Sequence, residues 1–291
     1  MSSHIHVSPT GLFWENTFFN LALAVYLIAV LCYLAHLLGK EQLGRFASHL
    51  LRLSFLVHTA FIVTRAINVQ RVPFVGSFEF GNMFVWATVL VYLWSEWRMQ
   101  EQFYAVGAFV TPLAMLYLAY LTVVPLLFPA IRISRVHSRL APVLQNKWLT
   151  VHVSTSIFGY AGFTLAFAAA VMWLLKRYLK SDHLITRALP GSKTLEEYMY
   201  RGAAFGFLFQ SAMIITGAIW ADISWGRYWG WDPKEMWALI TWFVYAVYLH
   251  ARFTRGWTGL RTVVLVMLGW VCMVFTWIGV AWLLSGLHSF G

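Results

Sequence analysis

Long apolar runs recur along the whole 291-residue chain and are separated by short polar connections. Several are near or above the roughly 20 residues that an α-helix needs to cross a bilayer. The pattern therefore predicts an all-α fold, a polytopic membrane helix bundle of about eight transmembrane helices. The third run is the shortest and the seventh has polar flanks, so a count of seven stays open. The predicted spans are 17–38, 49–69, 81–97, 103–128, 148–175, 202–221, 235–250 and 262–285.

We find no linker, low-complexity tract or internal repeat in the sequence, and we expect a single integral membrane domain over 1–291. The first apolar run has no small-residue cleavage pattern and is followed by further spans, so it is expected to stay as a membrane anchor. The longest polar interval, 176–201, is expected to be a loop with a turn at Pro190 and Gly191.

The composition supports a membrane solvent, because 60% of the residues are hydrophobic and only 11% are charged. The net charge of +10 is typical of the positive-inside rule and does not indicate a nucleic-acid partner. Basic residues crowd 176–201 and 252–261, which places these connections in the cytoplasm and both termini outside. The outer connection 129–147 breaks the rule with four cations. The four are Arg132, Arg135, Arg139 and Lys147. Either the positive-inside rule is only statistical here, or these cations meet an anionic ligand or partner.

Cysteine is nearly absent. Cys32 and Cys272 both lie inside apolar runs, where a thiol usually packs as a small hydrophobic group, and the sequence has no CxxC motif. Any thiol chemistry around this protein must therefore come from another chain.

Tryptophan is concentrated in one segment. Six of the sixteen tryptophans fall between Trp220 and Trp242, and the sequence WADISWGRYWGWDPKEMW mixes them with glycines and charges. This stretch is too polar to cross lipid, and we expect residues 222–236 to form an outer aromatic platform. Flat rigid indoles suit stacking on a porphyrin, and Arg227 or Lys234 could pair with its propionates. Asp232 before Pro233 predicts a capped helix start.

The segment WGRYWGWDPKEMWALITWFVYAVYLH closely resembles the WWD signature of the CcsA/ResC family of cytochrome c biogenesis proteins. LQNKWLTVHV at 144–153 and GLHSFG at 286–291 resemble the two outer histidine segments of the same family, whereas 65–80 resembles its remaining outer loop only weakly. The resemblance implies a system II protein that transports haem and handles it through the WWD domain. It also implies a bacterial inner membrane or a thylakoid-type membrane, with the haem site facing periplasm or lumen.

The same resemblance gives the histidines their expected roles. His152 and His288, at the outer helix ends, would be the axial ligands of one haem b beside the platform; Trp225, Trp229, Trp231 and Asp232 would contact it. His250 lies 17 residues after Pro233, about 25 Å deeper, and would ligate a second haem within the membrane. Its second ligand would come from a CcsB-like protein, with His58 or His36 as internal candidates. For those two, helix-packing hydrogen bonds are favoured.

The implied function is haem presentation at the outer face for covalent attachment to CxxCH motifs of apocytochrome c, as one subunit of a holocytochrome c synthase. The expected partners are a CcsB-like membrane protein, apocytochrome c and, indirectly, a thiol-reducing thioredoxin-like protein. Two alternatives stay open. One is a haem exporter or chaperone like the CcmC proteins, which share the signature, and the other is a dihaem membrane electron-transfer cytochrome.

Overall fold

A computed structural model describes residues 5–99, 103–128, 133–137 and 139–283, and every regular element within these ranges is helical. The all-α prediction is confirmed. Six of the described helices are long and apolar enough to cross a membrane. Two further helices, α3 (Ser77–Met99) and α8 (Pro233–Arg255), are not among these six. Each has 23 residues, which gives a length of about 34 Å at 1.5 Å per residue. The count of eight spans and the outside location of the termini stay predictions.

The chain forms two compact units. The N-terminal unit contains the described residues up to Leu144 together with Asp182–Pro190, and the C-terminal unit contains Gln145–Ser181 and the described residues from Gly191 onward. Each unit is a helical bundle in its own right, and the single domain expected over 1–291 stays a prediction.

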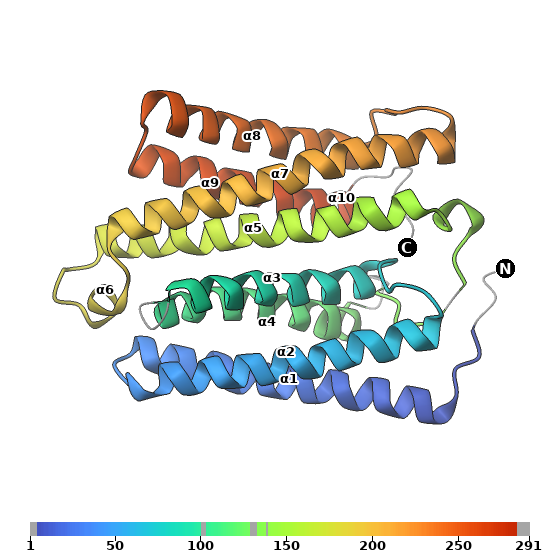
Figure 1. The fold of residues 1–291 in the computed structure, drawn as a ribbon, viewed down its shortest axis with the longest axis horizontal. Coiled ribbons are helices and arrows are strands. Elements are labelled where there is room, and N and C mark those ends of the chain that lie inside the picture. The colour runs from blue at the N-terminus through green and yellow to red at the C-terminus, as the bar shows by residue number, and fades with distance from the viewer. Residues whose placement is uncertain (1–4, 100–102, 129–132, 138, 284–291) are drawn as a thin grey trace. The chain divides into compact units, whose positions relative to one another are not determined.

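The described part of the N-terminal unit has four long helices, one short helix and a 3-10 turn, η2 (Pro142–Leu144). α1 (Pro9–Leu37) packs along α2 (Gln42–Val69) and α4 (Tyr104–Leu127), while α3 packs on α4 (Figure 1). The short α6 (Leu184–Ala188) lies in the predicted loop and contacts α1. α1 starts eight residues before the predicted span because Ser8 caps it, accepting a hydrogen bond from the backbone N–H of Gly11 at 3.0 Å.

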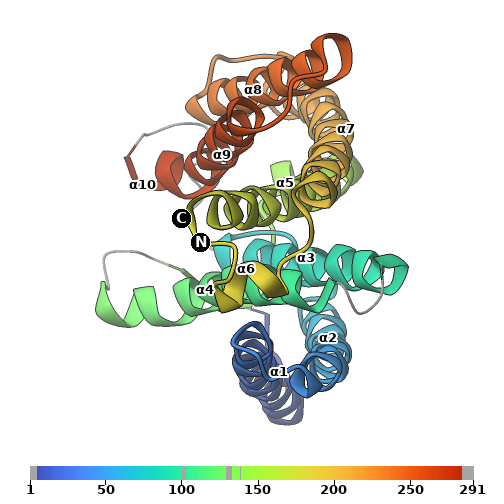
Figure 2. The same cartoon turned by 90° about the vertical axis from the view of Figure 1, so that its left-hand side faces the viewer.

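The C-terminal unit is a ring of four helices: α5 (Lys147–Tyr178), α7 (Ser192–Trp225), α8 and α9 (Leu260–Val274). In Figure 2, α7 lies between α5 and α8, and α9 completes the ring against α5. α9 continues through a π-helical segment (Phe275–Gly279) into α10 (Val280–Leu283). α7 extends well beyond the predicted 202–221, because the charged residues that lead into it continue the same helix.

Glycines hold α5 and α7 at close range. A Cβ atom on Gly162 would lie 2.8 Å from the backbone nitrogen of Gly206, and one on Gly206 would lie 2.9 Å from the carbonyl oxygen of Gly159. Small residues of this kind allow backbone contact between membrane helices, where lipid supplies no hydrophobic drive for association. This crossing sets the distance between the faces of α5 and α7 that form the candidate site.

Candidate functional site

His152 lies near the start of α5 and faces α7. A Cβ atom on Gly217 would lie 2.7 Å from Nδ1 of His152, so the imidazole occupies space that only glycine leaves open. The ring also lies nearly parallel to the buried Trp220, three residues further along α7, with 6.2 Å between ring centroids and 17° between planes. The predicted outer histidine therefore lies against α7 beside Gly217 and Trp220.

One hydrogen bond determines the tautomer of His152. Its Nδ1 atom lies 2.9 Å from the carbonyl oxygen of Met213. A carbonyl oxygen only accepts hydrogen bonds, so Nδ1 carries the proton and donates it, and the lone pair of the neutral ring is on Nε2. Histidines that bind a metal typically have this arrangement, with the second ring nitrogen donating to a carbonyl or carboxylate. The metal-ligand role predicted for His152 would therefore use Nε2.

The tryptophans of the predicted platform follow Trp220 along the chain, at the end of α7 and in the loop before α8. Trp220 and Trp225 meet edge to face with centroids 6.0 Å apart, and Trp229 meets Trp231 in the same way at 6.0 Å and 89°. α7 ends at Gly226, which adopts a left-handed φ of 72°. Edge-to-face contacts of this kind fix the angle between the two indoles of each pair.

Trp231 combines exposure with backbone strain. Its side chain is 69% exposed and its φ is +56°, a left-handed conformation that costs a residue with a Cβ atom about 1–2 kcal/mol. A large exposed apolar ring in a strained backbone does not improve folding. Strain of this kind is concentrated at functional sites, and Trp231 combines it with exposure, in keeping with its predicted place in the aromatic platform.

Asp232 caps α8, as its sequence context predicted. Its carboxylate accepts from the backbone N–H of Lys234 at 3.0 Å, and the side chain of Glu235 accepts from the N–H groups of Gly230 and Asp232 at 2.8 and 3.1 Å. The capping box is complete. Asp232 thereby fixes the loop that carries Trp229 and Trp231, and a direct contact of Asp232 with a ligand stays a prediction.

The other predicted ligands lie elsewhere. His288 is outside the described residues. His250 is exposed on α8, on the second-to-last turn before Arg255. His58 is buried and its Nδ1 lies 3.2 Å from the hydroxyl of Tyr26, whereas Nδ1 of His36 lies 3.2 Å from the carbonyl oxygen of Glu41. The contact of His58 joins α2 to α1 and is of the helix-packing kind favoured from the sequence, whereas that of His36 lies at the turn between α1 and α2.

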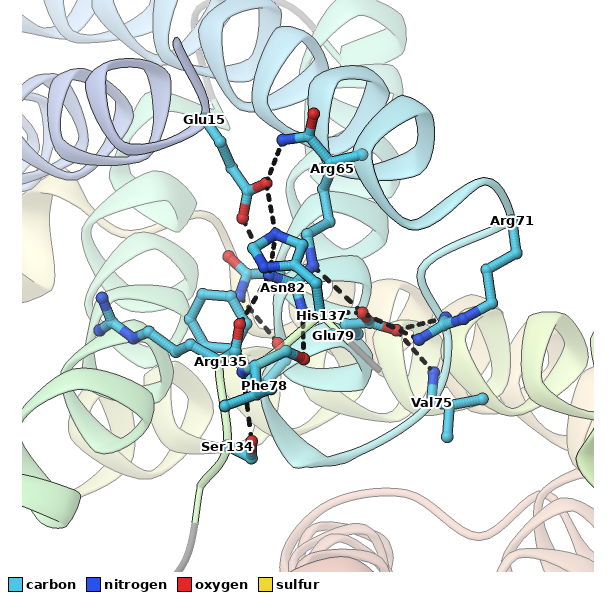
Figure 3. Close-up of polar contacts among 12 residues, drawn as sticks. Glu15, Arg65, Arg71, Val75, Phe78, Glu79, Asn82, Ser134, Arg135 and His137 are labelled. Carbon is cyan, nitrogen blue, oxygen red and sulfur yellow. Dashed lines mark hydrogen bonds and ion pairs between the residues drawn. The ribbon is translucent and has the colours of Figure 1, made fainter. Parts of the chain in front are cut away.

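Arg135 and His137, from the connection predicted to lie outside, contribute to a buried ion cluster in the N-terminal unit (Figure 3). Arg65, only 2% exposed, pairs with Glu15 and with Glu79 at 2.9 Å each. Its guanidinium also donates to the carbonyl oxygen of Arg135 at 2.9 Å and lies 3.0 Å from Nε2 of His137. The sequence carries no signal for this network, because its members are far apart along the chain, up to 122 positions between Glu15 and His137.

Arg135 was one of the cations offered to an external anion. In the structure its guanidinium lies over the rings of Phe19 and Phe78, at 5.1 and 4.9 Å from their centroids. Burial and the neighbouring Arg65 lower the pKa of the Arg135 guanidinium. Arg135 therefore serves the packing of the N-terminal unit.

Comparisons with known proteins cover both units. Residues 74–288 match the family model described as "Cytochrome C assembly protein". The chain is similar to the cytochrome c biogenesis protein CcsA of Guillardia theta, at 33% identity over 82% of this chain and 83% of the relative, and to CcsA of Gloeobacter violaceus, at 29% over 86% and 87%. The solved structure of Cytochrome c Heme Lyase CcmF shares the fold with a TM-score of 0.72 and 19% identity. That match covers 95% of this chain but 48% of the CcmF chain, so this chain spans about half of CcmF.

Proposed function

Because this chain belongs to the CcsA family of cytochrome c biogenesis proteins, we propose that it presents haem at the outer membrane face for covalent attachment to CxxCH motifs of apocytochrome c. Family membership gives the chain a role in cytochrome c maturation. The proposal adds the cargo, the site and the step, with this chain acting as one subunit of a cytochrome c synthase beside a CcsB-like protein.

The observation that carries the proposal is the placement of His152. Its Nδ1 donates to the carbonyl oxygen of Met213 and its ring lies along Trp220, so the ring is oriented and its Nε2 has the lone pair that haem iron requires. Rigid orientation by a second hydrogen bond raises the affinity of a histidine for a metal. Gly217 supports the assignment, since a Cβ there would displace the imidazole.

The neighbouring groups suit a porphyrin with two carboxylates. Trp225, Trp229 and Trp231 offer indole surface, and the exposed guanidinium of Arg227 is available to a propionate. His288 is the proposed second axial ligand. When bound, haem supplies the vinyl groups to which the two cysteine thiols add, and this chain supplies orientation and exclusion of competing contacts.

A second haem site is proposed at His250. Its imidazole is exposed on α8, where a ligand from another chain can reach it, and an ionisable residue within a span is a functional candidate by default. We therefore favour a CcsB-like protein as the source of the other axial ligand. His58 and His36 are the internal alternatives; both belong to the N-terminal unit, whereas His250 belongs to the C-terminal unit.

Co-expression tests the proposal. This chain, a CcsB-like partner and a CxxCH reporter exported across the membrane are expressed together, and covalent haem on the reporter is measured by haem staining. We expect His152→Ala to lose most of the product and to change the haem spectrum of the purified protein. His49→Ala, an exposed histidine of α2, is the control and should keep both.

The same experiment separates the alternatives. If His152→Ala and His288→Ala both leave attachment and spectrum unchanged, the outer site is wrong. A haem exporter would pass haem to a carrier whose two cysteines are replaced by serine, whereas a synthase requires those thiols. A dihaem electron-transfer cytochrome would keep its spectrum without the CcsB-like partner and would yield no modified reporter.

A further inference from the structure

An open hollow of about 310 Å³ lies where α5 ends and α9 begins. It belongs entirely to the C-terminal unit and to the connections predicted to be cytoplasmic, and the proposed haem sites do not use it. Its lining is cationic and apolar and contains no carboxylate. The lining residues are Arg177, Trp257, Thr258, Leu260 and Arg261.

The two arginines of the hollow have no carboxylate partner among the described residues. Neighbouring arginines differ: Arg252 lies 3.4 Å from a carboxylate oxygen of Glu196, and Arg201 lies 2.8 Å from one of Glu197. The acids of this end of the unit are therefore already paired. Arg177 and Arg261 leave two positive charges beside one opening, which favours an anion there.

Aromatic rings hold these guanidiniums at the hollow. Arg261 lies 5.6 Å from the ring centroid of Trp257, and Arg177 lies 5.5 Å from that of Trp173 and 5.9 Å from that of Tyr178. A cation–π contact orients an arginine while leaving its N–H donors available. The donors can therefore meet phosphate oxygens in a forked geometry.

The loop that forms one wall is fixed without a ligand. Gly259 has φ 73° and ψ −149°, a region that is essentially restricted to glycine, and its N–H donates to Glu196 at 3.0 Å. The carbonyl oxygen of Trp257 accepts from Arg252 at 2.9 Å. A ligand entering this hollow does not have to order the loop, which lowers the entropic cost of binding.

We infer that this hollow binds the phosphate headgroup of an anionic phospholipid, with Arg177 and Arg261 as the phosphate contacts and Leu260 and Trp257 along the first carbons of the lipid. Basic pockets at the cytoplasmic ends of membrane helices suit anionic headgroups. The apolar half of the lining favours a lipid over free phosphate, since phosphate alone gains nothing from Leu260.

Native mass spectrometry of the delipidated full chain in mild detergent tests this inference. We expect phosphatidylglycerol to bind the wild type, and the double variant Arg177→Gln/Arg261→Gln to bind it roughly thirtyfold more weakly, as expected for the loss of two arginine charges near an anionic group. Arg201→Gln removes an exposed cation of α7 that is paired with Glu197 and does not line the hollow, and it should bind like the wild type.

Three results would overturn the inference. The first is equal binding of phosphatidylglycerol by the wild type and the double variant. The second is equal binding of phosphatidylcholine with the same acyl chains, which would show that binding does not depend on the negative charge of the headgroup. The third is displacement of the lipid by an equal concentration of inorganic phosphate, which would make it a free-phosphate site. The double variant Arg177→Lys/Arg261→Lys changes the same two positions but keeps both charges, and it should retain most of the binding. If it also loses binding, the substitutions disturb the fold of the hollow and the loss is not due to charge.

Discussion

Replacement of Trp231 by glycine separates folding from ligand binding at the aromatic segment. Trp231 has a left-handed φ of +56° and is 69% exposed. Glycine relieves about 1–2 kcal/mol of backbone strain but costs about 0.5–1 kcal/mol of chain entropy. Loss of the edge-to-face contact with Trp229 costs about another 0.5–1.5 kcal/mol. These contributions offset each other to within about 1.5 kcal/mol.

We therefore expect Trp231→Gly to keep the wild-type unfolding temperature and to lose retained haem. The assay is circular dichroism on heating in detergent, together with haem counted per purified chain. Gln70 is the matched control, because it is the other non-glycine residue with positive φ in the described part of the chain, at +55°. It is exposed and follows the end of α2, a position where glycine is preferred, so Gln70→Gly should raise the unfolding temperature slightly and keep haem.

Two results would refute this reasoning. If Trp231→Gly retains as much haem as the wild type at unchanged stability, the exposed ring does not contact the cargo. If it lowers the unfolding temperature as much as the loss of a buried tryptophan does, the ring has a packing role and its exposure is misjudged. Either result would leave the assignment of His152 untouched, because His152 is positioned by α7 and not by Trp231.

Two further predictions concern buried contacts. Gly217→Ala places a Cβ 2.7 Å from Nδ1 of His152 and should shift the haem absorption spectrum. Gly191→Ala is the control, because its nearest neighbour would be 3.9 Å away, and it should leave the spectrum unchanged. An unchanged spectrum in Gly217→Ala would contradict the ligand role. Arg65→Gln leaves two buried glutamates without their shared cation and should lower the free energy of unfolding by about 3–5 kcal/mol, measured by thermal unfolding. The exposed Arg201→Gln is the control and should lower it by less than about 1 kcal/mol. Similar losses in the two variants would show that the cluster is solvated.

The sequence predicted features that depend on neighbouring residues. The start of α8 at Pro233 follows from Asp232 and Glu235, three positions apart, and the apolar runs give the cores of the long helices. Helix ends were predicted less well. α7 begins at Ser192, ten residues before the predicted span, because its first turns are polar and hydropathy does not register them.

Buried polar networks could not be predicted. Glu96 lies in the charged end of α3, where a sequence suggests an exposed side chain, but it is 2% exposed. The hydroxyls of Tyr33 and Tyr92 donate to it at 2.7 and 2.6 Å, and that of Ser48 also donates. These partners come from three helices, so only the tertiary packing determines that the carboxylate is buried and satisfied.

The proposed haem site joins two parts with different physical constraints. His152 rests on α7 through a backbone carbonyl and a glycine notch, and the distance between α5 and α7 is set by backbone contacts at Gly162 and Gly206. The imidazole of His152 is therefore held as rigidly as the helix crossing itself. Trp231, in contrast, is exposed and belongs to a loop fixed only through the cap of α8. A carrier that must orient its cargo and then release it benefits from this division, because the imidazole can set the plane of approach while the exposed side leaves the porphyrin edge accessible to an incoming polypeptide.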